Sequence, residues 1–448
     1  ILSFSEYHTL FIIPLFRNKI NIFSYILLIL FGGLLMKFYK IFLCLFIFIF
    51  CYFYPVFADD EDFEVFSVEP TTINTYYNTN SEPTINSKSA IIYERSSGLV
   101  LYGKAENEKR KMASTTKIMT AIIVIENSNL DNVVVVSHSA ASTGGSRLGL
   151  HENDKISIRD LLYGLMLCSG NDAAVALAET ISGNVECFAD LMNKKANELN
   201  LTSTHFVTPH GLDEEEHYTT AFELAKITNY ALNNKVFCNF VVTKNQTVYI
   251  NGIPKTLSNT NELLGNLSGV YGVKTGFTNG ANRCLVTAVK RDNMDLICIV
   301  LGADTKKDRT KDSVSLIEYA FKNFTMVNIQ EKIETEFSNW KLCNSSSFTV
   351  IKGKSNNIDA VLEDLPYSFL PVNCNHLDDI SIYIYCNTIF EAPLNANSIL
   401  GYLIVSVDNQ TILTVNIYNS NYIPYNTSID FYKIILKNYT YYLEGIFY

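Results

Sequence analysis

Hydrophobic and polar positions follow two different periods along the chain, and the change between them predicts strands on both sides of a helical middle. Two short apolar runs at 89–93 and 99–102 flank a polar stretch, which predicts a β-hairpin. Apolar residues three or four positions apart predict helices. Such helices are expected at 114–126, 158–168, 172–181, 185–199 and 314–324. Alternating or wholly apolar runs predict strands at 240–242, 247–250, 269–274, 284–289 and 296–301.

The order of these elements predicts the fold class. Strands, then helices, then strands and a final helix fit an α+β domain over 89–324, in which early and late strands share one sheet. After Phe324 the chain is rich in Ile, Tyr, Val and Asn, with strand patterns at 381–385, 401–407 and 411–417. A second, small all-β domain is therefore expected at 325–424. The remaining residues, 425–448, form an aromatic-rich, lightly charged tail from which weak membrane contact is the most that we expect.

Residues 1–58 have the pattern of a leader that directs export. Lys37 and Lys40 precede an apolar run at 41–57, and Ala58 offers a small residue at the expected cleavage site. No Met precedes Met36, so Met36 is the expected start of the natural protein. A cleaved signal peptide is therefore favoured.

An uncleaved anchor is the alternative for the leader, because residues 20–35 are also apolar. Either arrangement exports the rest of the chain. The following segment, 59–88, is first acidic and then rich in Thr, Asn, Ser and Pro. This composition predicts a flexible linker.

The composition excludes several classes of protein. Hydrophobic residues make up 48% of the 448 residues and the mean hydropathy is +0.11, which excludes general disorder. The net charge of -10 gives no basic surface for phosphates, so nucleic acid is not an expected partner. The ten Cys are spread singly, without a C-x-x-C pair or a Cys/His cluster at ligand spacing. Neither a metal site nor a dense disulfide framework is therefore expected.

Ser114 and Lys117 form the first of three segments that carry chemistry. Residues three apart on a helix share one face, so the hydroxyl and the amine would lie within hydrogen-bonding reach. A serine hydroxyl becomes a strong nucleophile when a base takes its proton, and Lys can be that base where burial and a second cation lower its pKa. The spacing alone is weak, since about one or two matches arise by chance in such a chain. The alternative for Ser114 is a helix N-cap.

The second segment, Ser169-Gly170-Asn171, falls between two predicted helices. Its hydroxyl could relay a proton to a leaving nitrogen, and its amide could hold a substrate carbonyl. The same triplet recurs as Ser182-Gly183-Asn184, directly after one predicted helix and before the next. There Gly as terminator and Asn as N-cap explain the residues structurally. The first triplet is therefore favoured as the functional one.

The third segment, Lys274-Thr275-Gly276, ends a predicted strand that could lie at a sheet edge. Its Lys and Thr could bind a carboxylate, the Lys charge could help to keep Lys117 neutral, and Gly276 would let a ligand approach the backbone. An exposed Lys on an edge strand is otherwise a common device against aggregation. The order and contexts of the three segments favour a single site built from all of them.

Together the three segments resemble the signature of class A β-lactamases and penicillin-binding proteins, with Gly170 in place of an Asp. The S-G-N form is similar to that of the low-molecular-mass D-alanyl-D-alanine carboxypeptidases, a serine-type family. Further similarity to this family lies at 113–120, 210–212, 259–261 and 272–278. The resemblance covers about 89–324 and implies a β-lactamase/transpeptidase-like domain, an antiparallel sheet flanked by helices. Residues 392–417 resemble more loosely the family's small C-terminal β domain.

The resemblance implies a role for each matching residue. Ser114 would form the acyl-enzyme, with Lys117 as its base. Ser169 would complete the proton path and Asn171 would hold the substrate. Lys274 and Thr275 would recognise its terminal carboxylate. The backbone N–H groups of Ser114 and Phe277 would form the oxyanion hole, beside Gly276.

Arg309 is similar in placement to a family arginine near the carboxylate pocket. A solvated charge in a Lys-rich loop is an equally open interpretation of this residue.

The implied activity is removal of the terminal D-alanine from peptidoglycan pentapeptides through an acyl-enzyme, without a metal or an organic cofactor. The expected partners are stem peptides that end in D-Ala-D-Ala, and β-lactam antibiotics as covalent inhibitors. The implied location is the extracytoplasmic face of a bacterial membrane, or the cell wall.

Two alternatives share the acylating serine. A class A β-lactamase needs an E-x-x-L-N loop, and the nearest candidate, Glu262 with Asn266, has Gly265 where Leu belongs. A penicillin-sensing receptor would be acylated without turnover and should carry transmembrane and signalling parts, whereas the only strongly apolar segment here is N-terminal. Release of free D-alanine from a pentapeptide would separate the three functions.

Overall fold

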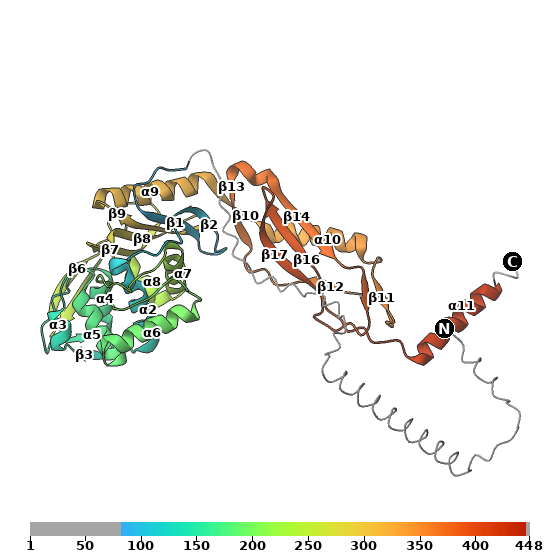
Figure 1. The fold of residues 1–448 in the computed structure, drawn as a ribbon, viewed down its shortest axis with the longest axis horizontal. Coiled ribbons are helices and arrows are strands. Elements are labelled where there is room, and N and C mark those ends of the chain that lie inside the picture. Colours follow the sequence, from blue (N-terminus) through green and yellow to red (C-terminus); the bar gives the residue numbers. More distant parts are fainter. Residues whose placement is uncertain (1–81, 445–448) are drawn as a thin grey trace, which may run out of the picture. The chain divides into compact units, whose positions relative to one another are not determined.

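A computed structural model describes residues 82–444 (Figure 1). The predicted leader at 1–58, its expected start at Met36 and most of the predicted linker at 59–88 lie outside the described residues. The end of that linker is not a loose tether. Ile85 is buried in a hydrophobic core, and the backbone N–H groups of Asn86 and Ser87 donate to Oδ2 of Asp312 at 3.0 and 2.8 Å. One carboxylate therefore holds the chain just before the first strand.

A five-stranded antiparallel sheet forms the centre of the first domain, in the order β2-β1-β9-β8-β7. The first strand pairs with the last, with Ser89 opposite Leu301, so the expectation that early and late strands share one sheet is confirmed. β7 lies at the edge, as predicted for the segment that contains Lys274. The strands are β1 (Ser89–Glu94), β2 (Val100–Lys104), β7 (Val270–Thr278), β8 (Asn282–Arg291) and β9 (Met294–Ala303).

Helices cover both faces of this sheet, which explains why its inner strands are apolar at almost every position. On β9, Ile297 and Ile299 join the core shared with α2 and its neighbouring helices, whereas Leu296 and Cys298 join the core beneath α9. Figure 1 shows α9 (Lys306–Asn323) on one side and the remaining helices of this domain on the other. These are α2 (Lys117–Asn127), α3 (His138–Ser142), α4 (Ile158–Met166), α5 (Asn171–Ser182), α6 (Val185–Glu198), α7 (Ala221–Leu232) and α8 (Lys235–Val242).

Two further two-stranded ladders border the helices. They are formed by β3 (Val133–Val135) with β4 (Lys155–Ser157), and by β5 (Asn245–Ile250) with β6 (Ile253–Ser258). The strand expected at 240–242 is wrong, because these residues end helix α8. The Asn234 side chain accepts hydrogen bonds from the N–H groups of Val236 and Phe237, and the helix buries Phe237 and Phe240 on one face. A three-residue apolar run could not distinguish this helix end from a strand.

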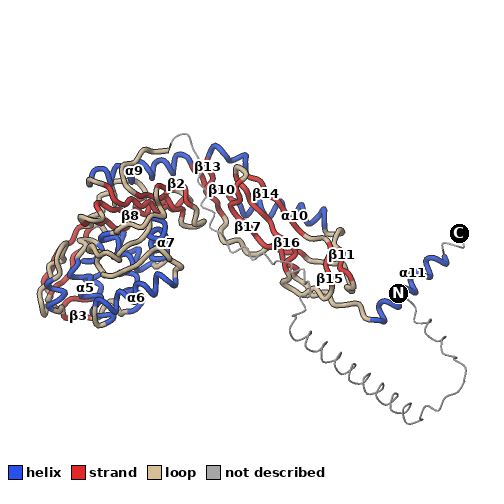
Figure 2. The backbone as a smooth tube through the Cα atoms, in the orientation of Figure 1, coloured by secondary structure: helices blue, strands red, loops and turns tan. Residues whose placement is uncertain are grey.

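The C-terminal region is rich in strands, as expected, but it also contains a helix. Figure 2 shows α10 (Ile329–Asn344) among strands coloured red. Ile329, Ile333 and Phe337 are buried in the core and recur every fourth residue, between charged positions that hid the pattern. The strands are β10 (Phe324–Asn328), β11 (Thr349–Ile351), β12 (Ala360–Leu362), β13 (Phe369–Asn373), β14 (Ile380–Cys386), β15 (Ile389–Glu391), β16 (Ile399–Val407) and β17 (Gln410–Asn419).

Four of these strands form a sheet in the order β12-β17-β16-β14, while β10 pairs with β13 and β11 with β15. A 3-10 helix, η2 (Cys374–Asp379), precedes β14. Within the tail predicted at 425–448, residues Ser428–Glu444 form helix α11. Among residues 82–444, no helix is both long and apolar enough to span a bilayer.

Candidate active site

Ser114 and Lys117 lie where a short 3-10 helix runs into a longer α-helix. η1 (Ala113–Thr116) carries Ser114, and Lys117 is the first residue of α2. The Nζ atom of Lys117 lies 2.8 Å from Oγ of Ser114, within hydrogen-bonding distance. The N-cap positions of the two helices belong to Met112 and Thr116, so the interpretation of Ser114 as a helix cap is wrong.

The Lys117 amine is fully buried and meets two further oxygen atoms. Its Nζ lies 2.7 Å from Oδ1 of Asn171 and 2.9 Å from the carbonyl oxygen of His210. A neutral amine has two N–H donors and one lone pair. The two donors can serve Asn171 and His210, which leaves the lone pair facing the Ser114 hydroxyl. The geometry therefore suits transfer of the hydroxyl proton to Lys117.

Electrostatics favour this neutral form. Burial, reinforced by the charge of Lys274, lowers the pKa of Lys117 well below its ordinary value, while Cys168 and Asp172 oppose the shift. Burial and the charge of Lys274, the two causes suggested by the sequence, thus act on Lys117 in the same direction.

His210 is a member of the site to which the sequence pattern assigned no role. Its carbonyl oxygen holds Lys117, and the bond from Oγ1 of Thr120 to the Pro209 carbonyl, at 2.6 Å, ties this segment to α2. Burial, the largest cause, lowers the pKa of the His210 imidazole to about 3, so the ring is neutral at physiological pH. The group that contacts Lys117 is a backbone carbonyl, which any residue type could supply. The sole signal for this contact in the sequence was therefore the family-like segment 210–212.

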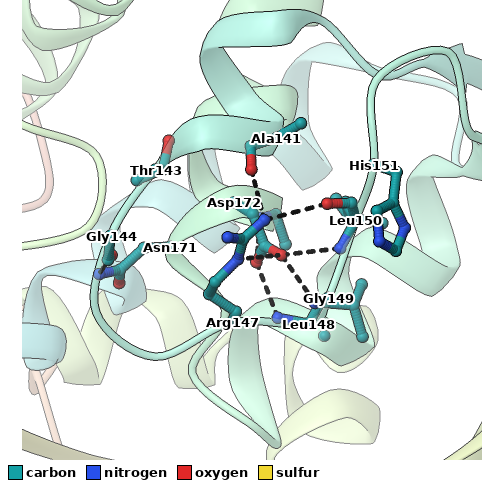
Figure 3. Close-up of polar contacts among 12 residues, drawn as sticks. Ala141, Thr143, Gly144, Arg147, Leu148, Gly149, Leu150, His151, Asn171 and Asp172 are labelled. Atoms are coloured by element: carbon teal, nitrogen blue, oxygen red, sulfur yellow. Dashed lines mark hydrogen bonds and ion pairs between the residues drawn. The ribbon is translucent and has the colours of Figure 1, made fainter.

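The Ser169-Gly170-Asn171 triplet supplies the second side of the site at the start of α5. Asn171 begins the helix and uses both ends of its amide: Oδ1 accepts from Lys117, and Nδ2 donates to the carbonyl of Gly144 at 2.7 Å (Figure 3). Ser169 has a φ of 61°, a left-handed conformation unfavourable for residues other than glycine. Its Oγ is buried without a hydrogen-bond partner among the described residues. Strain and an unused hydroxyl are typical of a functional position.

Strand β7 supplies the third side. Lys274 is buried and its Nζ donates to the carbonyl of Thr275 at 3.1 Å. The Thr275 hydroxyl lies 2.8 Å from that of Thr260. Burial lowers the pKa of Lys274 to about 7; Cys168 opposes the shift and the charge of Arg309 adds to it. Lys274 is therefore not a solvated lysine that merely guards a sheet edge.

Gly276 lies against η1. A β-carbon added to it would stand 3.1 Å from the Ser114 nitrogen and 3.1 Å from the Ala113 β-carbon, so a larger residue would push the strand away from the serine. The next residue, Phe277, exposes 48% of its surface, and its ring lies beneath the guanidinium of Arg283 at 3.6 Å. The strand therefore approaches Ser114 with backbone, not with side chains.

Comparison with known proteins agrees with this geometry. A family model described as D-alanyl-D-alanine carboxypeptidase matches residues 76–305. The carboxypeptidase DacF of Bacillus subtilis is 34% identical over 338 residues, covering 74% of this chain and 84% of the relative. The chain belongs to the D-alanyl-D-alanine carboxypeptidase family.

Solved structures support the family's fold here. Penicillin-binding protein 5 from Haemophilus influenzae superposes with a TM-score of 0.64 at 26% identity, covering 77% of this chain and all of the other. The Streptomyces K15 DD-transpeptidase gives 0.52 at 36% identity over 54% of this chain and 99% of its own. The expected serine-type carboxypeptidase acting on cell-wall peptides is thereby confirmed, in preference to the β-lactamase and receptor alternatives. Such peptides place its action outside the cytoplasm.

Within this carboxypeptidase fold, Arg309 is not a solvated charge. It is 3% exposed in α9, and its guanidinium donates to Oε1 of Glu262 at 3.1 Å. Glu262 also pairs with Lys306 at 2.6 Å. Burial alone would raise the pKa of Glu262, but bonds from Lys306 and Thr310 and the charge of Arg309 lower it overall. A carboxylate tied to two cations is poorly suited to act as the hydrolytic base of a β-lactamase.

A group of side chains with metal-ligating chemistry lies in the C-terminal region. The ligand atoms of His376, Asp379 and Asp408 are within 4.8 Å of one another, from η2 and from the turn between β16 and β17. His376 Nδ1 lies 2.8 Å from Asp379 Oδ2. None of the three belongs to the segments that form the site around Ser114.

Proposed function

We propose that Ser114 is the acylating nucleophile and that Lys117 is the base that activates it. The observation that carries this assignment is the 2.8 Å contact between Lys117 Nζ and Ser114 Oγ, made by a lysine with no exposure to solvent. Ser114 would attack the carbonyl of the penultimate D-alanine while Lys117 takes the hydroxyl proton. Collapse of the tetrahedral intermediate expels the last D-alanine, and water then releases the shortened peptide.

Ser169 and Asn171 complete this proposal on the second side of the site. The unpartnered Ser169 hydroxyl would pass a proton to the leaving nitrogen, and Asn171 would hold the substrate amide while it keeps Lys117 in place. The developing oxyanion would accept hydrogen bonds from the backbone N–H groups of Ser114 and Phe277. Gly276 leaves room for that approach.

Lys274 and Thr275 would bind the terminal carboxylate of the substrate. A buried ammonium and a hydroxyl on one strand edge provide charge and direction for a carboxylate. Arg309, buried and close enough to affect the pKa of Lys274, would add a second positive charge behind the pocket. β-Lactam antibiotics carry a carboxylate and a strained amide, so they would acylate the same serine.

Helix α11 favours contact with the outer face of a membrane. It leaves large apolar side chains exposed at Ile429, Tyr432, Ile435 and Leu436. Exposed apolar residues on one helix are suited to the interfacial region of a bilayer. Sedimentation with vesicles would test this; equal binding by a chain truncated after Pro424 would contradict it.

Release of free D-alanine from a pentapeptide ending in D-Ala-D-Ala tests the catalytic assignment. Ser114→Ala should abolish both this release and labelling by a fluorescent penicillin. Ser182→Ala is the matched control, because Ser182 belongs to the second S-G-N triplet and bonds to the carbonyls of Ala178 and Asn184. Labelling that persists in Ser114→Ala would overturn the nucleophile, and loss in Ser182→Ala would overturn the choice of triplet.

A further inference from the structure

Asp172, the residue directly after Ser169-Gly170-Asn171, binds a loop through its carboxylate. The loop lies outside the three segments that form the candidate site. This loop, residues 143–151, follows α3 and contains no helix or strand; β4 begins at Lys155. Three consecutive backbone N–H groups donate to the Asp172 carboxylate: Leu148 at 2.7 Å, Gly149 at 2.7 Å and Leu150 at 3.0 Å (Figure 3). Arg147 Nε adds an ion pair at 3.7 Å. Asp172 is completely buried, so these partners satisfy a charge that water does not reach.

The same loop touches the catalytic amide from its other end. The carbonyl of Ser146 accepts from the Asn171 backbone N–H at 2.7 Å, and that of Gly144 accepts from Asn171 Nδ2 at 2.7 Å. Because Nδ2 must face the Gly144 carbonyl, Oδ1 must face the Lys117 amine. With the amide turned over, two donors would meet at Lys117. The loop therefore decides which way Asn171 points.

Gly145 shows how closely the loop fits around Asn171. It has a φ of +86°, and an added β-carbon would lie 2.5 Å from Asn171 Nδ2. The loop can pass this close to Asn171 because the position has no side chain and adopts a left-handed backbone.

We infer that Asp172 is a positioning residue for acylation: by holding the 143–151 loop it orients Asn171, and through Asn171 it places the Lys117 amine against Ser114. This inference rests on the proposed roles of Ser114 and Lys117. Asp172 acts through a hydrogen-bonded chain and need not touch the substrate.

The charge of Asp172 also affects the pKa of Lys117. The titratable groups close enough to interact electrostatically with this amine are Lys274 from β7, Cys168 before α5, Asp172 from α5, and His210. Removal of the Asp172 charge takes away an anion that favours the ammonium form. The lysine then becomes neutral at a lower pH, so the acid limb of the acylation profile moves to lower pH. A loop anchor without influence on Lys117 would not cause this movement.

Acylation of the full chain by a fluorescent penicillin, measured over a range of pH, tests the inference with three variants. Asp172→Asn keeps the size of the side chain but places an amide nitrogen against backbone donors. It should lower the maximal acylation rate constant by about 30-fold and move the acid limb to lower pH. Gly145→Ala keeps the charge while displacing Asn171, so it should lower the rate without moving the limb.

Asp154→Asn is the matched control. Asp154 is also a buried carboxylate beside this loop, accepting from the His151 N–H at 2.7 Å and from Asn251 Nδ2 at 2.6 Å, but it has no bond to Asn171. Its acylation rate should stay within about twofold of the unmodified protein.

Several results would overturn the role of Asp172. They are a normal rate in Asp172→Asn, a reduced rate with an unmoved limb, a normal rate in Gly145→Ala, or an equal loss in Asp154→Asn. If Asp172→Asn does not fold, Gly145→Ala decides by itself whether the loop controls acylation. Failure of the proposed function would look different, because the unmodified protein would then not be labelled at Ser114.

Discussion

The two S-G-N triplets contain the same three residues at the two ends of helix α5, yet their side chains have different surroundings. Ser169 precedes the helix in a left-handed conformation with an unpartnered hydroxyl, and Asn171 reaches Lys117. At the other end, Gly183 ends α5 with a φ of 85°, and Asn184 caps α6 by accepting from the Cys187 N–H. The hydrogen-bond partners of each triplet therefore depend on the helix terminus at which it lies.

The surroundings beyond the helix complete the difference. The first triplet lies against a buried lysine from α2 and the 143–151 loop. The second triplet itself forms the turn between α5 and α6. In the proposed mechanism the Asn171 amide, which accepts from a buried amine, affects reactivity, whereas the Asn184 amide, which accepts from a backbone N–H, affects stability. Paired substitutions at equivalent positions can separate these effects.

The largest contrast is expected for the two serines. Ser169→Ala should lower the rate of D-alanine release by about 1,000-fold, because it removes the proposed proton donor for the leaving nitrogen. Ser182→Ala should leave the rate unchanged. Steady-state kinetics on a pentapeptide measure both; similar rates in the two variants would remove the functional distinction between the triplets.

The asparagines should differ by a smaller factor. Asn171→Ala should lower acylation by about 100-fold, since Lys117 loses an acceptor that orients it. Asn184→Ala should instead cost about 1 kcal/mol of unfolding free energy, as for other N-caps, at normal activity. Denaturant unfolding and penicillin labelling of both variants would show whether one loses activity and the other stability. A loss of stability without a loss of activity in Asn171→Ala would contradict this expectation.

The pH dependence of catalysis tests the third segment, Lys274-Thr275-Gly276, which has no counterpart beside the second S-G-N triplet. The pKa of Lys274 is lowered to about 7, so the free enzyme loses this positive charge as the pH rises through that region. Binding of a carboxylate substrate should weaken by about tenfold for each pH unit above it, in kcat/KM and less in kcat. Lys274→Arg keeps its charge, because the guanidinium titrates above about 12, and should abolish this alkaline limb. A limb that persists in the arginine variant would assign it to another group.

The smallest effect is expected at the glycines. Gly183→Ala places a β-carbon in a left-handed position with open space around it, so it should cost about 1 kcal/mol of stability without affecting activity. In Gly170→Ala the new carbon would stand 2.8 Å from Asp172 Oδ1, which should disturb the loop and lower activity as well. Thermal unfolding and penicillin labelling of the pair would test this, and equal activity in both would contradict it.

Much of the site was predictable because its residues come in short segments with local structural causes. Ser114 and Lys117 are close through helical spacing, and the end of α5 at Gly183 follows from glycine and asparagine as helix punctuation. The part played by His210 was not predictable, because the group that acts is a backbone carbonyl and any residue type supplies one. For Arg309 the sequence left two interpretations open, a solvated charge and a pocket residue. Its burial comes from the packing of distant segments, which the residues around it in the sequence do not reveal.

The amino-acid sequence by itself determined the α+β order of the elements and the helical spacing of Ser114 and Lys117, because these depend on spacing and residue type within a few turns or strands. Only the tertiary structure decided that helix α10 belongs to the β-rich region, that Glu262 is held by Lys306 and Arg309, and that Asp172 anchors a loop against Asn171. Those results depend on which distant groups share a dry interior. There, an unpaired charge or amide is costly enough to select its partner, and nothing local in the chain specifies that partner.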